Sequence, residues 1–341
     1  MKRNYSIDLM RVFLCLCVIT VHSLNHFGIN NGYVNSFVST FLLQANGAFF
    51  MLSGYFNLEK EFNSSSDIKK YYKNKVIYIV FPFLAFLFVW GIWDYVHINS
   101  SFDILDFLST FYMTVMNDSA ETHLWFMYPL FGLLLSTPFL SKLLHSMNEK
   151  ELKIMWYVTL GWDAICYYLC TDMGVSFRFL NWFIDGWLIY YFAGYYYRHV
   201  ISKESKLKWA ILGILCYVLT NMGHLYLDTF VGTTDIQPMF VIFCVSCLMF
   251  WDKAIKINGE KKSKVITFIS KHTFLIYMFH MRGIEFALRK FNIVNESLGD
   301  GLLVVLGAFV FSLIASYIAN LLLKLVQKFL DKKWIIKESV Y

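Results

Sequence analysis

The sequence contains little charge for its length. Charged residues make up 16% of its 341 positions, against about 25% in an ordinary soluble domain. Hydrophobic residues make up 57% of the chain and aromatic residues 19%. This composition predicts a protein that crosses the membrane several times. Repeats of the kind that build solenoids are also missing.

Cysteine pairs in loops, which would suggest disulfides or zinc sites, are missing as well. All seven cysteines fall in apolar runs: Cys15, Cys17, Cys166, Cys170, Cys216, Cys244 and Cys247. The last two form a C-x-x-C pair, but it lies inside an apolar stretch with no further His or Cys nearby. We interpret all seven as small buried side chains, and we expect no metal site and no bound cofactor.

Hydropathy predicts ten membrane-spanning helices of about 20 residues each. They lie near residues 7–27, 36–57, 76–96, 124–144, 153–171, 182–199, 208–227, 236–252, 265–281 and 301–325. Another apolar stretch, 102–116, is short and interrupted by acids, which is typical of an interfacial or re-entrant helix. The predicted fold is therefore all-α, a polytopic membrane helix bundle. We interpret residues 1–341 as one membrane domain with a short C-terminal tail at 326–341.

Basic residues alternate between the predicted connections. They gather at both ends of the chain and in every second connection, while the other connections hold only Arg178, Arg282, Arg289 and Lys290. The positive-inside rule then places both termini in the cytoplasm. The net charge of +6 suits anionic lipid headgroups, so we expect membrane lipid, and no nucleic acid, as a partner.

The first predicted span carries three ionisable residues, Asp8, Arg11 and His22. A charged side chain inside a membrane helix costs at least about 2.5 kcal/mol, so it usually faces protein or a cavity. At about 100° per residue, Arg11 and His22 share one face and lie roughly 16 Å apart along the axis. Asp8 is within pairing reach of Arg11. The alternative is a structural Asp8–Arg11 pair, with His22 as an interfacial anchor.

Later spans hold weaker candidates. Small residues at Ser53 and Gly54 favour a packing contact or a kink over a nucleophilic serine. Trp125 belongs to an aromatic cluster that is typical of a membrane interface. Tyr277 and His280 lie at the predicted outer end of their span, on the same side of the membrane as His22.

Several motifs in order resemble the acyltransferase-3 family of integral membrane acyltransferases. The first is the opening SIDLMRVFLCLCVITVHS, in which an arginine and a histidine are separated by ten residues. FFMLSGYF follows at 49–56, and a basic loop then leads into a span with proline, KKYYKNKVIYIVFPFL. HLWFMYPLFGLLLSTPFL, YYFAGYYY and FLIYMFH come after it. The first two motifs together are fairly specific, and the series covers nearly the whole chain.

The resemblance implies acyl transfer across a membrane. The implied donor is cytoplasmic acetyl-CoA, and the implied acceptor is a hydroxyl of an extracytoplasmic glycan or lipid-linked sugar. The implied location is the plasma (inner) membrane of a bacterium, with multiple passes. The expected activity is that of a membrane-bound O-acetyltransferase.

Roles for individual residues follow as expectations. His22 takes the proton of the acceptor hydroxyl or relays the acyl group. Arg11, held by Asp8, anchors the donor or stabilises developing charge. Lys73 and Lys75 stand where the family often has arginine. Lysine keeps the charge but loses the two-pronged hydrogen bonding of arginine, so phosphate recognition there should be looser. The alternative reading is that these lysines only orient the chain in the membrane.

Two other functions compete with acyl transfer. A transporter or flippase for a glycan or small solute also places ionisable residues in its spans, usually with internal repeats and correspondingly broken helices. The four prolines, at 82, 129, 138 and 238, show no such symmetry. A membrane sensor or scaffold would use the polar stripe only for assembly.

Overall fold

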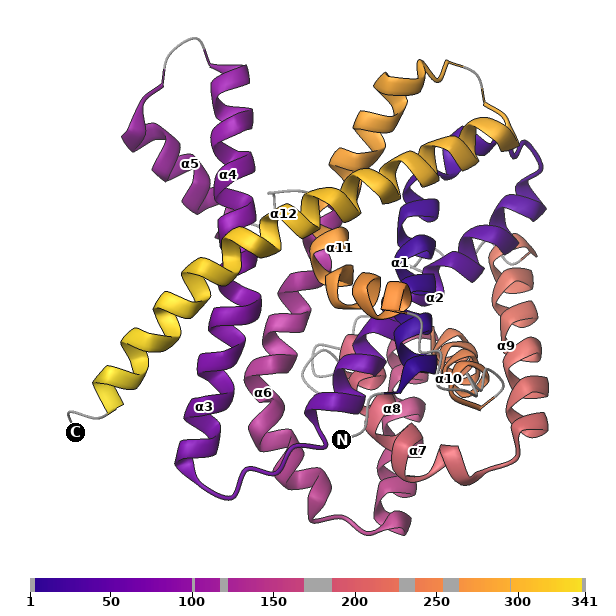
Figure 1. Cartoon of the computed structure of the whole chain (residues 1–341). Coiled ribbons are helices and arrows are strands. Elements are labelled where there is room, and N and C mark those ends of the chain that lie inside the picture. Colours follow the sequence, from indigo (N-terminus) through magenta and orange to yellow (C-terminus); the bar gives the residue numbers. More distant parts are fainter. Residues whose placement is uncertain are drawn as a thin grey trace. The chain divides into compact units, whose positions relative to one another are not determined.

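The computed structural model describes residues 4–99, 102–116, 122–168, 186–226, 237–253, 264–294 and 296–338. All regular elements in these ranges are helices, as predicted, and the longer ones are labelled in Figure 1. Their bounds are α1 Tyr5–His22, α2 Gly32–Asn57, α3 Ser65–Lys75, α4 Phe81–Ile98, α5 Ile104–Met116, α6 Met127–His145, α7 Glu149–Ile165, α8 Trp187–His199, α9 Lys206–Tyr226, α10 Pro238–Lys253, α11 Lys264–Phe291 and α12 Leu298–Glu338. Short 3-10 segments follow α1, precede α6 and follow α8.

Five of the described helical stretches are long and apolar enough to cross a membrane. They are Tyr5–His22, Gly32–Asn57, Ser65–Ile98, His123–His145 and Leu298–Lys328. Helices α7, α8 and α10 coincide with predicted spans but have 17, 13 and 16 residues, and the predicted span 182–199 begins outside the described residues. The multi-pass character is thus supported, while ten spans and cytoplasmic termini stay predictions.

The contacts divide the chain into two compact units. Unit 1 comprises Met1–Glu61 and Thr137–Leu313, and unit 2 comprises Phe62–Ser136 and Ile314–Tyr341. The interpretation of residues 1–341 as one membrane domain stays a prediction.

Helices α2 and α8 in unit 1 approach so closely that glycine is required on both. A Cβ atom on Gly54 would lie 1.9 Å from the carbonyl oxygen of Tyr191, and one on Gly194 would lie 1.9 Å from that of Met51. Both obstacles are backbone atoms, which cannot rotate away. The close approach supports the packing interpretation at Gly54. Ser53 itself is half-buried, and its hydroxyl accepts a hydrogen bond from Asn57 of the same helix.

We expect Gly54→Ala to destabilise the folded protein by more than the ~1–3 kcal/mol that is typical of overpacking, because α2 and α8 must separate to admit the methyl group. Thermal unfolding of the purified protein in lipid would measure the effect. Gly161→Ala is the control, since nothing lies within 4 Å of that position in α7 of the same unit. An equal unfolding temperature for the two variants would contradict the close helix contact.

Two segments of unit 2 differ from the prediction. The basic segment before the proline-containing span is helical rather than a loop, because Ser64 and Asp67 form a reciprocal capping box that begins α3. Helix α3 continues through a π-helical segment, Val76–Val80, directly into α4. The predicted tail that begins at residue 326 is helical as far as Glu338, where α12 ends. Helices α4 and α5 pack side by side as a hairpin (Figure 1), and α5 confirms that 102–116 holds a short apolar helix.

The prediction of buried cysteines holds for Cys15, Cys17, Cys216 and Cys244, whereas Cys166 and Cys247 are half-buried. All six are free thiols. Cys170 lies outside the described residues. The C-x-x-C pair at Cys244 and Cys247 lies within α10, where Cys244 is fully buried.

Candidate functional site

Helices α1 and α11 of unit 1 lie side by side and run in the same direction. Near their N-terminal ends, the Ser270 hydroxyl donates a 2.7 Å hydrogen bond to Asp8. Further along both helices, the rings of His22 and His280 come together. Between these contacts an apolar core holds the helices, with Cys15 and Ile19 from α1 and Ile276 from α11. Asp8 and His22 of α1 therefore lie beside Ser270 and His280 of α11.

The two histidines form a close pair. Their ring centroids are 5.1 Å apart with an interplanar angle of 46°. His280 is fully buried, whereas His22, the last residue of α1, is exposed. The pair therefore combines one imidazole that a ligand can reach with one that protein surrounds.

The surroundings of His280 fix its orientation. Its Nδ1 lies 2.5 Å from the carbonyl oxygen of Tyr277, and the Tyr277 ring stacks on the imidazole at a centroid distance of 5.6 Å. Because a carbonyl oxygen only accepts hydrogen bonds, Nδ1 carries the proton in this contact. In the neutral ring the lone pair is then on Nε2. Tyr277 thus orients His280 through both its backbone and its ring.

The helix that carries His280 extends beyond the predicted span. The hydropathy pattern ends near residue 281, yet α11 continues to Phe291. The added turns carry Arg282, Glu285, Arg289 and Lys290, and Arg282 pairs with Glu285 at 3.5 Å. Charged side chains on one face lower the mean hydropathy without ending the helix.

A second feature lies at the opposite end of α1. A cavity of about 650 Å³ is lined there by the first turns of α1, the end of α2 with the residues after it, the end of α8 and the first turns of α11. Four cationic side chains from these four segments line it: Arg11, Lys60, Arg198 and Lys271. Two acids, Asp8 and Glu59, also line it. The lining residues carry a formal charge of +2 from four cations and two acids.

Aromatic rings and ion pairs hold two of the arginines. The Arg11 guanidinium lies 5.0 Å from the ring centre of Phe56, and that of Arg198 lies 5.1 Å from the ring of Tyr55. Arg198 also pairs with Glu59 at 3.4 Å. Such cation–π contacts are worth roughly 0.5–2 kcal/mol each, so they keep the guanidinium groups at the wall of the cavity.

The glycine contact between α2 and α8 positions this wall. Tyr55 and Phe56 directly follow Gly54, and Arg198 comes one helical turn after Gly194. The backbone contact holds the ends of α2 and α8 together, and Tyr55, Phe56 and Arg198 near these ends line the same cavity. The two FFMLSGYF and YYFAGYYY motifs are thus joined in the structure, which the sequence did not predict.

Sequence analysis missed most of the residues that line this cavity. The sequence pattern did not single out Lys60, Arg198, Lys271, Glu59 or Tyr55. The sequence feature that could have pointed to Arg198 is its position directly after YYFAGYYY. Arg11 and Asp8, by contrast, do line the same cavity, as their shared face on α1 suggested.

The other predicted site residues belong to unit 2. Lys73 and Lys75 lie in the last turn of α3, where the ammonium of Lys75 is 5.1 Å from the ring centre of Tyr71. Trp125 is half-buried in the segment Thr122–Phe126, with its ring edge-on to that of Phe126. The functional roles of these three residues remain predictions.

Comparisons with known proteins fix the family. A family model described as an acyltransferase domain matches residues 4–321, which is nearly the whole chain. The chain belongs to the acyltransferase-3 family. The matched region contains Arg11, His22 and His280, and it contains every residue of the cavity wall. A search for similar solved structures found no match.

One relative of this acyltransferase-3 protein is named for a different activity. The chain is 25% identical over 355 residues to an amino-acid racemase of Enterococcus faecalis, and the match covers 96% of this chain. The chain spans 47% of the length of that relative. Among the described residues, no group of three or more His, Cys, Asp or Glu side chains is placed to hold a metal ion.

Proposed function

We propose that this protein is a membrane-bound O-acyltransferase that moves an acetyl group from cytoplasmic acetyl-CoA to a hydroxyl of an extracytoplasmic glycan or lipid-linked sugar. The observation that carries this proposal is the arrangement along α1. A cavity with four cations lies at one end of the helix and a histidine pair at the other. Membership of the acyltransferase-3 family supports the reaction class.

The cavity suits the donor end of such a reaction. Acetyl-CoA carries several phosphate charges, and arginine binds phosphate with two parallel hydrogen bonds. Tyr55 and Phe56 add aromatic surface beside the cations. The charge pattern of the sequence predicts the N-terminal ends of α1 and α11 on the cytoplasmic side, where acetyl-CoA is found.

The histidine pair suits the acceptor end. In direct transfer, a neutral imidazole takes the proton of the acceptor hydroxyl while the hydroxyl oxygen attacks the thioester carbonyl carbon. The carbon–sulfur bond then breaks, and CoA leaves as a thiolate that is later protonated. In the two-step alternative, an imidazole nitrogen first accepts the acetyl group and then passes it to the acceptor. His22 is the exposed member of the pair, and His280 supports it from the buried side.

The test is the chemical fate of a labelled donor. Membranes with and without the protein are incubated with acetyl-CoA that is labelled in the acetyl group, and the carbohydrate fraction is then isolated. We expect label in that fraction only when the protein is present, and mild alkali should release it as acetate because O-esters are alkali-labile. Label that resists mild alkali would contradict O-acylation. Solute uptake without any incorporated label would favour a transporter.

A further inference from the structure

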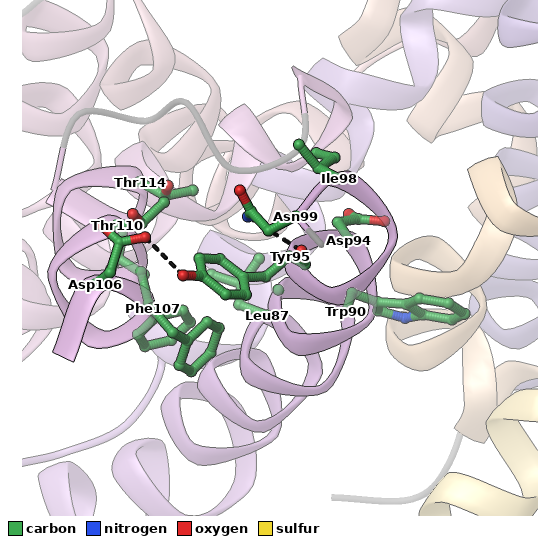
Figure 2. A pocket seen from close by; sticks show the side chains of 13 residues that line it. Leu87, Trp90, Asp94, Tyr95, Ile98, Asn99, Asp106, Phe107, Thr110 and Thr114 are labelled. Carbon is green, nitrogen blue, oxygen red and sulfur yellow. Dashed lines mark hydrogen bonds between the residues drawn. The ribbon is translucent and has the colours of Figure 1, made fainter. Parts of the chain in front are cut away.

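A second cavity lies within unit 2, between α4 and α5 (Figure 2). Its volume is about 440 Å³, which falls in the range of roughly 300–1,000 Å³ that small-molecule sites occupy. Both helices are joined by only a short connection, so the cavity is formed by one hairpin. Nothing in the proposed acyl-transfer chemistry uses it.

The polar side chains of this cavity come from one face of each helix. Asp106, Thr110 and Thr114 follow one another at intervals of four residues on α5, so they stand in one row. Figure 2 shows this row opposite Tyr95 and Asn99, which come from the last turn of α4 and the residue after it. Hydroxyl, carboxylate and amide groups therefore face one another across the cavity.

Hydrogen bonds hold these groups in place before any ligand arrives. The Tyr95 hydroxyl donates a 2.6 Å hydrogen bond to Asp106, which ties α4 to α5. The Asn99 amide donates to the carbonyl oxygen of Tyr95 at 3.1 Å. Phe107 is 2% exposed, and its ring packs against that of Tyr95 at a centroid distance of 5.6 Å. A cavity with fixed polar groups loses little entropy when it binds a ligand.

The lining also limits the charge of the ligand. It includes two carboxylates, Asp94 and Asp106, and none of the described residues around the cavity is lysine, arginine or histidine. These carboxylates would repel an anion, whereas the cavity of unit 1 that Arg11 lines has a net positive lining. Carboxylate, amide and threonine groups are good partners for hydroxyls, and the aromatic rings of Tyr95 and Phe107 add apolar surface.

We propose that the α4–α5 cavity binds one uncharged sugar ring, a pyranose whose hydroxyls meet the row Asp106–Thr110–Thr114. A pyranose offers hydroxyls that both donate and accept, together with apolar C–H surface, and the cavity offers the complement of each. Binding of this ring does not depend on acyl transfer. That the ring is part of the acceptor rests on the proposed function.

The experiment measures sugar binding by the full-length protein in phospholipid nanodiscs. Detergents with sugar headgroups are avoided, because they would compete for the cavity. The probes are methyl pyranosides of glucose, galactose and N-acetylglucosamine, and glucuronic acid is the anionic match to glucose. Ligand-observed saturation-transfer NMR gives the affinities. We expect at least one neutral ring to bind, and glucuronic acid to bind at least about tenfold more weakly than glucose because like charges repel.

Two variants test the residues. Asp106→Asn keeps an oxygen that can accept from Tyr95, and it should weaken sugar binding at least about tenfold by removing a charge-assisted hydrogen bond. Thr110→Val removes one hydroxyl at nearly constant shape and should weaken binding severalfold. Asp103→Asn is the matched control, because Asp103 caps α5 through hydrogen bonds to the backbone at residues 105 and 106 without lining the cavity. Asparagine caps equally well, so we expect unchanged affinity.

Three results would overturn the proposal. The first is no binding of any neutral pyranoside to the folded wild-type protein. The second is tighter binding of glucuronic acid than of glucose. The third is an equal loss of binding in Asp103→Asn and Asp106→Asn, which would assign the effect to net charge rather than to the cavity. Acetyl transfer that persists without sugar binding would leave the proposed function intact while rejecting this site.

Discussion

Replacing His22 with alanine is expected to lower acetyl transfer by at least about 100-fold, because general acid–base catalysis contributes roughly 10²–10⁴ in rate. His22 is exposed at the end of α1, so the change leaves the core intact. The measurement is the rate of label transfer from acetyl-CoA into the carbohydrate fraction, at equal amounts of folded protein.

The control for this prediction is His26→Ala. His26 lies four residues further on, in the 3-10 segment Leu24–Phe27, and is outside the ring pair. We expect the His26→Ala variant to retain acetyl-transfer activity. Full activity in folded His22→Ala protein would contradict the assigned role.

His280 separates two versions of the mechanism. If the histidines act as a unit, removing both should cost little more than removing either one, because such effects are strongly non-additive. If His280 only supports the fold, the activity lost in His280→Ala should be explained by unfolding, and the variant should have a lowered unfolding temperature, since His280 is fully buried. The double variant His22→Ala/His280→Ala distinguishes these outcomes.

Replacing Arg11 with lysine is expected to weaken use of the donor by roughly 10–100-fold, which is the worth of a charged hydrogen bond of about 1.5–3 kcal/mol. Lysine retains the positive charge in the cavity but loses the planar fork that grips a phosphate. The effect should appear mainly in the KM for acetyl-CoA, with a smaller change in kcat.

Arg289→Lys supplies the matched control, because Arg289 is an exposed arginine of α11 that does not line the cavity. We expect its KM for acetyl-CoA to equal that of the wild type. An unchanged KM in Arg11→Lys would show that Arg11 serves the structure alone. The contact of its guanidinium with Phe56 would then be its main role.

The sequence predicted the features that lie within a single helix. The common face of Asp8, Arg11 and His22 on α1 follows from helical geometry, and the structure places Asp8 and Arg11 in the cavity and His22 beside His280. The cavity as a whole was not predictable, because Lys60, Arg198 and Lys271 come from distant parts of the chain. Only the close contact of α2 with α8 at Gly54 and Gly194, and the pairing of α1 with α11, brings them together.

Helix boundaries were predicted less well, for identifiable reasons. The capping pair Ser64 and Asp67 was visible in the sequence, but lysine-rich composition was read as a loop. Helix α12 passes the expected end near residue 325 because no glycine or proline follows Gly307. Helix α11 extends to Phe291 because its charged residues occupy one face. Hydropathy marks the apolar part of a helix, not its ends.

The most direct test of the central claim uses sealed inside-out membrane vesicles, in which the cytoplasmic face is outside. Labelled acetyl-CoA, which does not cross the membrane, is added to the outer medium with wild-type or His22→Ala protein. We predict alkali-labile label on carbohydrate inside the wild-type vesicles, and none with the variant. Label confined to the outer face of the vesicles, or equal label with both proteins, would contradict transfer along α1 from a cytoplasmic donor cavity to the histidine pair.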